Sequence, residues 1–184
     1  MATTTQRITA EEYARLPDPF PVPVELERGR VVELYWLTER EAGVRDIIRR
    51  LVAGYSATHA ERFVVLGLAS MITRRNPDTV RIGEMWVYER ERLPQQFPWP
   101  DYMPHAPDVA FEIKSCRAGW GRTYARIGEL LEIGTPIVCV VDPAHETVRQ
   151  YFADSPSVIL TAADELTFPN QLPGFSVLVQ RLFE

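Results

Sequence analysis

The feature that most constrains the fold is an unbroken apolar run at Pro136–Asp142 (PIVCVVD). A short, continuously apolar segment of this kind predicts a strand buried on both faces, as in parallel sheets. Val109–Lys114 (VAFEIK) predicts an earlier strand, and a helix at about Arg122–Ile133 separates the two, with Gly134 just past its end. This strand–helix–strand unit indicates an α/β fold.

The N-terminal half predicts a helix, a hairpin and a second helix. Thr9–Glu12 reads as a capping box that opens a helix ending near Leu16, before a proline-rich lead-in. Val24–Leu37 predicts a hairpin that turns at Arg28-Gly29. After Thr38, apolar residues follow the i, i+3, i+4 spacing of an amphipathic helix as far as Tyr55.

The remaining segments favour strands around one long loop. The predicted strands are Arg62–Thr73, Arg81–Tyr88, Thr147–Phe152 and Val158–Ala162. Leu93–Pro107 holds five prolines in 15 residues, which predicts an irregular loop. We expect a single domain with a mixed sheet flanked by helices, in which residues 1–23 form the lead-in and residues 24–184 the core.

The composition excludes several classes of protein. With 46% apolar and 24% charged residues, the chain has the balance of a globular domain rather than a disordered one. No apolar run approaches the roughly 20 residues that span a bilayer, and the first residues lack a signal-peptide pattern. A net charge of −5 argues against coating nucleic acid by bulk electrostatics. We expect a cytoplasmic protein that has no contact with a membrane.

Glu112 and Lys114 are the candidate chemical pair. Lys114 is the only lysine among 20 cationic residues, so this position is a candidate for a role that needs an ammonium rather than a guanidinium. Two residues apart on a strand, both side chains point to the same face about 7 Å apart. Such a pair suits a divalent metal held by Glu112, with Lys114 orienting water and countering charge on a phosphate.

The metal needs a second acidic ligand, and the sequence offers three. Glu84 is preferred because it interrupts an apolar strand, where an unpaired carboxylate is costly. Asp108 comes next, although four residues of strand place it about 13 Å from Glu112. Asp101, in the proline-rich loop, is the third choice.

An acid on one strand followed by Glu-x-Lys on the next resembles the signature of the PD-(D/E)XK nuclease superfamily. The chain resembles its Uma-two branch of restriction-endonuclease-like proteins in ITAEEYARLP, VELERGRVVEL, APDVAFEIKS, IGTPIVCVVDP and LPGFSVL, in that order. The resemblance implies a restriction-endonuclease-like core and a DNA endonuclease that uses Mg²⁺ or Mn²⁺. It also implies Glu84, Glu112 and Lys114 as site residues, with Asp108 on the family's Pro-Asp and Glu25 on its hairpin glutamate.

The chain departs from the family pattern at three positions. Gly83-Glu84 stands where the family has Pro-Asp, Glu41 where a histidine is common, and Arg126 where a lysine is common. These departures leave an alternative open, namely a catalytically inactive nucleic-acid-binding or assembly module with the same fold.

Two further interpretations concern partners. Arg122 and Arg126, one helical turn apart, suit contacts with DNA phosphates. The proline-rich loop carries several large apolar side chains whose exposure to water is unfavourable. We therefore expect it to pack on a partner subunit in a homodimer or larger homo-oligomer. The apolar side chains are Leu93, Phe97, Trp99, Tyr102 and Met103.

Overall fold

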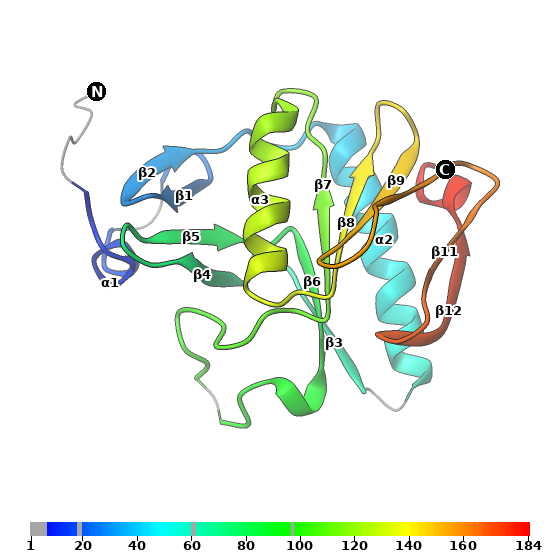
Figure 1. Cartoon of the computed structure of the whole chain (residues 1–184), viewed down its shortest axis with the longest axis horizontal. Coiled ribbons are helices and arrows are strands. Elements are labelled where there is room, and N and C mark those ends of the chain that lie inside the picture. The colour runs from blue at the N-terminus through cyan, green and yellow to red at the C-terminus, as the bar shows by residue number, and fades with distance from the viewer. Residues whose placement is uncertain (1–6, 18–19, 60–61, 97) are drawn as a thin grey trace.

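The computed structural model describes residues 7–17, 20–59, 62–96 and 98–184, and its centre is a six-stranded mixed sheet (Figure 1). The strand order is β10-β9-β8-β7-β6-β3, in which β7 and β8 pair in parallel and the other neighbours pair antiparallel. The bounds are β3 Phe63–Leu66, β6 Met85–Glu89, β7 Val109–Ile113, β8 Ile137–Asp142, β9 Thr147–Phe152 and β10 Val158–Leu160. The predicted parallel pair is therefore confirmed.

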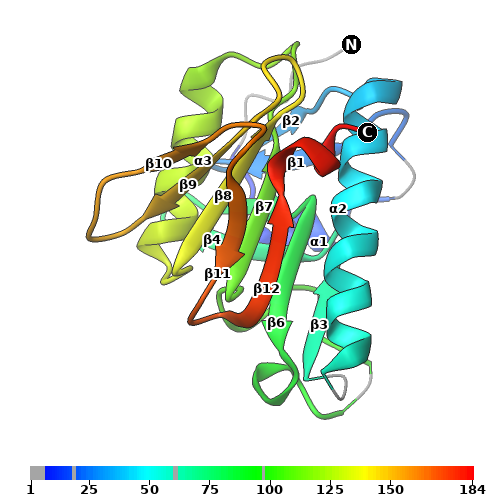
Figure 2. The ribbon, with the colours of Figure 1, turned by 90° about the vertical axis from the view of Figure 1, so that its right-hand side faces the viewer.

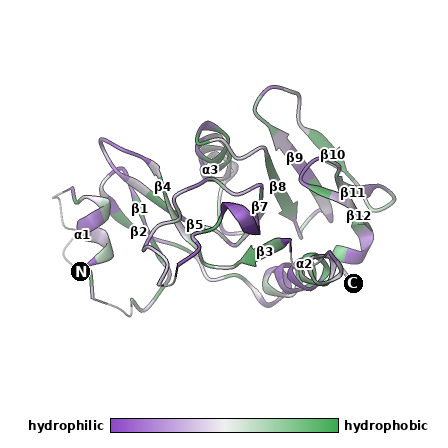
Figure 3. Cartoon of the chain, turned by 90° about the horizontal axis from the view of Figure 1, so that it is seen from below, coloured by the Kyte–Doolittle hydropathy of each residue, from purple (hydrophilic) through white to green (hydrophobic). Residues whose placement is uncertain are grey.

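Helices α2 (Glu39–Thr58) and α3 (Trp120–Glu132) cover opposite faces of this sheet (Figure 2). Ile48 of α2 packs in one core cluster and Ile127 of α3 in another, because alternate residues of β7 and β8 point to each side. All six residues of β8 are buried, and the strand is hydrophobic up to its last residue, Asp142 (Figure 3). A hairpin of β11 (Glu165–Phe168) and β12 (Leu172–Leu178), absent from the sequence prediction, adds to the α2 side.

A second sheet of four strands lies beside the first, in the order β2-β1-β5-β4. Its bounds are β1 Val24–Glu27, β2 Arg30–Glu33, β4 Ser70–Arg74 and β5 Thr79–Ile82. β1 and β2 form the predicted hairpin, and Gly29 adopts the left-handed φ of 78° that its turn requires. Helix α1 (Ala10–Ala14) has the predicted capping box at Thr9 and Glu12.

Two of the predicted strands are each divided between the two sheets. Arg62–Thr73 becomes β3 and β4, and Arg81–Tyr88 becomes β5 and β6, with Gly83 and Glu84 between them. A Cβ atom on Gly83 would lie 2.2 Å from Cε2 of the fully buried Trp86, so only glycine lets the chain turn under this ring. The expectation of one continuous strand is therefore wrong, and Glu84 lies at the junction of the sheets.

The other connections follow the prediction closely. Leu93–Pro107 contains no helix or strand among its described residues and follows a short 3₁₀ turn at Arg90–Arg92. Helix α3 begins at Trp120, two residues earlier than predicted, with Gly119 at its N-cap, and Gly134 follows it with a φ of 98°. A second 3₁₀ turn, Val179–Leu182, follows β12. Within the described ranges, no helix combines the length and the apolar character needed to cross a membrane.

Candidate functional site

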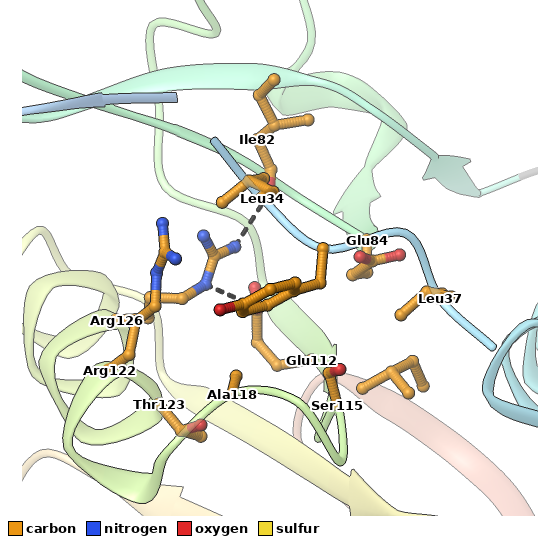
Figure 4. A pocket seen from close by; sticks show the side chains of 12 residues that line it. Leu34, Leu37, Ile82, Glu84, Glu112, Ser115, Ala118, Arg122, Thr123 and Arg126 are labelled. Atoms are coloured by element: carbon orange, nitrogen blue, oxygen red, sulfur yellow. Dashed lines mark hydrogen bonds and ion pairs between the residues drawn. The ribbon is translucent and has the colours of Figure 1, made fainter. Parts of the chain in front are cut away.

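A pocket of about 90 Å³ lies at the carboxyl end of β7, where α3 begins (Figure 4). We call it the carboxylate pocket. Its walls come from the β2–α2 segment, the end of β5, the junction before β6, the β7–α3 loop and the first turns of α3. The lining residues are Leu34, Tyr35, Leu37, Ile82, Glu84, Glu112, Ile113, Ser115, Ala118, Arg122, Thr123 and Arg126.

Glu112 presents one bonded and one unbonded carboxylate oxygen. Its Oε2 accepts a hydrogen bond of 2.9 Å from Nε of Arg126. Its Oε1 is buried and has no hydrogen-bond partner in the described part of the chain. Burial raises the pKa of Glu112 by more than the Arg126 charge lowers it. A buried, unpartnered carboxylate oxygen is costly, so this atom is suited to receive a cation or a proton.

Glu84 lines the same pocket from the junction between the sheets. Its carboxylate makes no hydrogen bond or ion pair with the described residues. Burial, and next the negative charge of Glu112, raise the pKa of Glu84 above its usual range. The two carboxylates therefore repel each other, and a positive charge placed near both would relieve that repulsion. The structure thus brings Glu84 and Glu112 together, as the strand pattern predicts.

Glu25 lies behind Arg126 and does not line the carboxylate pocket. It is fully buried, and its Oε1 accepts hydrogen bonds from Nη1 of Arg126 at 2.5 Å and from the backbone N–H of Ile82 at 2.8 Å. Its Oε2 accepts from Nη1 of Arg81 at 3.1 Å. Burial alone would raise the pKa of Glu25, but the two guanidinium groups outweigh it and lower that pKa. Glu25 is thus held as an anion between two arginines.

The arginines extend this arrangement into a row of alternating charges. Arg81, 1% exposed, also binds Glu129 of α3 through Nε at 2.7 Å and Nη2 at 3.0 Å. We call Glu129, Arg81, Glu25, Arg126 and Glu112, in that order, the charge row. It joins the small sheet to α3 and ends at the carboxylate pocket.

Lys114 follows β7 and does not line the pocket. Its Nζ donates hydrogen bonds to the carbonyl oxygens of Ser115 at 2.7 Å and Ala118 at 2.5 Å, and lies 5.4 Å from the centroid of the Trp120 ring. The ammonium therefore holds the β7–α3 loop against the start of α3. Its predicted contact with water beside Glu112 requires it to leave these carbonyls.

Asp108 and Asp101 lie elsewhere. Asp108 stands just before β7, at the opposite end from the pocket, where it accepts a hydrogen bond from the backbone N–H of Glu89 and pairs with Arg92. Asp101 is exposed in the proline-rich loop. The structure therefore does not bring either of these two acids to Glu112.

The two predicted phosphate contacts do reach the pocket. Arg122 and Arg126 both line it, and Nη2 of Arg122 is buried without a hydrogen-bond partner among the described residues. The guanidinium of Arg126 instead donates hydrogen bonds to Glu25, Glu112 and the carbonyl oxygen of Ile82. Arg122 is thus the arginine that is available to an anion.

Two residues, one in the pocket wall and one bonded to the loop beside it, have no role predicted from the sequence. Tyr35 lines the pocket although 55% of its surface is exposed, and its only signal was an aromatic pair, Tyr35-Trp36, directly after a hairpin. Glu41 is the N3 residue of the α2 capping box and also accepts a 2.6 Å hydrogen bond from the backbone N–H of Cys116. It connects the start of α2 to the loop after β7.

The donor set restricts the kind of metal that fits. No group of three or more His, Cys, Asp and Glu side chains suited to a metal ion occurs in residues 7–17, 20–59, 62–96 and 98–184. The pocket offers two carboxylates instead. Mg²⁺ is commonly bound by one or two carboxylates together with waters and substrate phosphates, so the residues present fit such an ion.

Comparisons with known proteins identify the fold. No family model matches the sequence, and no curated protein matches it. Among solved structures, the chain is similar to a protein from Anabaena variabilis ATCC 29413 that is described as a "putative nuclease belonging to DUF820". The TM-score is 0.83 at 17% sequence identity, over 96% of this chain and 97% of that one. The two proteins therefore share one fold along nearly their whole lengths.

Proposed function

We propose that this protein is a phosphodiester hydrolase that depends on Mg²⁺ or Mn²⁺ and acts on DNA. The observation that carries the proposal is the unbonded, buried Oε1 of Glu112 in a pocket that it shares with the unpaired carboxylate of Glu84. The similar fold of the protein described as a "putative nuclease belonging to DUF820" supports the same class of activity. It supports no particular residue.

Glu84 and Glu112 would hold the cation. When bound, a divalent ion supplies Lewis-acid stabilisation of the charge that develops on a phosphate. Arg126 orients Glu112 by donating to Oε2, which leaves Oε1 as the ligand atom. Arg122, with its unpartnered Nη2, contacts the phosphate.

Lys114 enters the proposal in one of two roles. As the sequence predicts, its ammonium orients the attacking water and stabilises the transition state. Alternatively, it is a positioning residue that fixes Ser115 and Ala118, two residues of the pocket wall. Lys114→Arg separates the roles. If Lys114→Arg keeps both DNA cleavage and the thermal stability of the wild type, the positioning role is supported. If it keeps the stability but loses cleavage, the catalytic role is supported.

One contact favours the non-catalytic alternative. The guanidinium of Arg126 already places positive charge against Glu112 and Glu25, which a binding module would retain without any metal. In that case the protein would bind nucleic acid without cutting it.

Cleavage of plasmid and single-stranded DNA tests the hydrolase. The wild type is incubated with Mg²⁺ or Mn²⁺ beside Glu112→Ala, Lys114→Ala and the surface control Glu132→Ala. We expect cleavage by the wild type and the control, and loss of at least about 100-fold for Glu112→Ala, by analogy with other sites that lose one electrostatic group. Equal cleavage by all four would reveal a contaminating nuclease and contradict this site.

A further inference from the structure

A second cavity, of about 290 Å³, lies on the other side of α3 from the carboxylate pocket. On the helix, Trp120 and Tyr124 form one i, i+4 row, and Arg122 and Arg126 form another. The buried stripe that contains Ile127 lies between the two rows, so they emerge on either side of the helix. We call this second space the aromatic cavity. Its lining residues are Trp120, Tyr124, Val140, Asp142, His145, Thr147 and Arg149.

One wall of the aromatic cavity is a pair of stacked, partly exposed rings. The centroids of Trp120 and Tyr124 are 5.4 Å apart with the planes tilted by 30°, and the two side chains are 36% and 48% exposed. Exposed apolar side chains that stand singly are ordinary, but adjoining ones are a feature of ligand-binding surfaces. These two keep ring surface available for another flat group.

Positive charge surrounds the Trp120 ring. Nζ of Lys114 lies 5.4 Å from its centroid, and Cζ of Arg149 lies 5.9 Å away. Aromatic rings interleaved with cations are the combination by which proteins hold unpaired bases and their phosphates.

The opposite wall of the cavity is polar. Asp142 lies there with Thr147, and its Oδ2 pairs with Nδ1 of His145 at 2.9 Å. A ligand that fits both walls has an aromatic face, a hydrogen-bonding edge and a negative charge. A nucleotide has all three, and a volume of about 290 Å³ is close to the roughly 300 Å³ of the smallest ligand pockets.

We propose that the aromatic cavity binds an unpaired base of a single-stranded nucleic acid, while a phosphate farther along the same strand lies at Arg122. This inference deepens the proposed function, on which it relies for the class of ligand. A base within a duplex is stacked on both faces and is unavailable to Trp120 and Tyr124. The net charge of −5 provides little long-range attraction to a duplex, so stacking has to supply much of the affinity.

Fluorescence anisotropy in EDTA tests the inference without any cleavage. The probes are a labelled oligothymidylate of about 12 nucleotides, within the usual site sizes, and a mixed-sequence duplex of the same length. The variants are Trp120→Ala, Tyr124→Ala and Tyr124→Phe. Trp99→Ala is the matched control, because Trp99 is 37% exposed but lies in the proline-rich loop. Thermal melting verifies that each variant is folded.

We expect the wild type to bind the single strand more tightly than the duplex. Loss of one stacking ring should weaken that binding by about 5- to 150-fold, whereas Tyr124→Phe and Trp99→Ala should retain it. The inference is overturned if the wild type binds no single strand, if it binds the duplex equally well, or if Trp120→Ala and Tyr124→Ala bind like the wild type. It is also overturned if Trp99→Ala weakens binding as much as they do.

The two proposals fail in different ways. Single-strand binding through Trp120 with no cleavage in Mg²⁺ or Mn²⁺ would contradict the hydrolase and leave the base site standing. Cleavage that depends on Glu112 but not on Trp120 or Tyr124, with unchanged binding, would contradict the base site alone.

Discussion

Glu112 is the residue at which metal binding is most directly tested. A cation that binds only the folded state stabilises it, by about 2.7 kcal/mol at a hundredfold excess over its dissociation constant. We expect Mg²⁺ or Mn²⁺ to raise the melting temperature of the wild type and of the control Glu132→Gln, but not of Glu112→Gln. Differential scanning fluorimetry measures the shift. If millimolar Mg²⁺ and Mn²⁺ leave the wild-type curve unmoved, the hydrolase proposal falls.

The pKa of Glu84 gives this site a defined pH dependence. Since its folded pKa is raised above the usual value of 4.5, the folded state holds its proton longer than the unfolded state. Its contribution to stability is therefore complete at low pH and is lost as pH rises through the folded pKa. Relative to the wild type without metal, Glu84→Gln should gain stability as pH rises from about 4.5. Urea titrations across pH measure this, and a constant difference would contradict it.

The same protonation opposes metal binding. A carboxylate must lose its proton before it can ligate a cation, so the affinity for Mn²⁺ should increase from about pH 5 to pH 8. Isothermal titration calorimetry follows this in the same series of buffers, and an affinity that does not vary with pH would place the ion away from Glu84 and Glu112.

Removal of Glu25 should destabilise the fold more than removal of any surface acid. Removing it leaves Arg81 and Arg126 without a shared partner in a buried place, and breaking a buried pair in this way costs about 3–5 kcal/mol. We expect Glu25→Ala to lower the free energy of unfolding by that amount in urea. The exposed pair of Arg74 and Glu132 is the control, since Glu132→Ala should cost at most about 1 kcal/mol. Equal effects would mean that the charge row does not stabilise the fold.

At the scale of elements, the turn between β5 and β6 places Glu84. Gly83→Ala forces a Cβ atom against the buried Trp86 ring, so we expect a loss of stability together with loss of the metal response. Gly128→Ala, in α3, meets nothing within 4 Å and should instead stabilise by up to about 1 kcal/mol. Urea unfolding measures both variants. If Gly83→Ala leaves the free energy of unfolding unchanged, the Trp86 ring can move aside and the expectation is wrong.

The same turn has one feature that the sequence predicts and one that it does not. Glu84 was found because a carboxylate in an apolar strand demands a reason, but the pattern of Arg81–Tyr88 carries no sign that the strand changes sheets. That change accompanies the close approach of the Trp86 ring to Gly83, which strand periodicity alone does not show. The hydrogen bonds of Lys114 are not predictable from the sequence either. Strand alternation predicts which face of the sheet a side chain lies on, but not which carbonyl oxygens accept hydrogen bonds from the ammonium.

At the scale of the whole molecule, the proline-rich loop packs mainly on its own chain. Leu93 and Met103 are buried in the core cluster on the α3 side, and the hydroxyl of Tyr102 donates to the carbonyl oxygen of Ala10. Trp99 remains partly exposed, and Phe97 lies outside the described residues. The apolar surface on which the predicted homodimer depended is therefore much reduced.

Light scattering at micromolar concentration decides the oligomeric state. If a homodimer forms through the exposed part of this loop, Trp99→Ala should shift the wild-type mass toward that of the monomer, 21.0 kDa. A wild type that is already monomeric would end the prediction of a homo-oligomer.

The charge row also has a consequence for how sequences of this fold can diverge. Replacing one member leaves its buried neighbours with one charged partner fewer, so an isolated replacement is destabilising. Paired replacements, such as a neutral residue at Glu129 together with one at Arg81, avoid that cost. In homologous sequences, the residues at the positions of the charge row should therefore change together. A sequence pattern that scores each position independently would fail to detect such relatives, even though their backbones superpose.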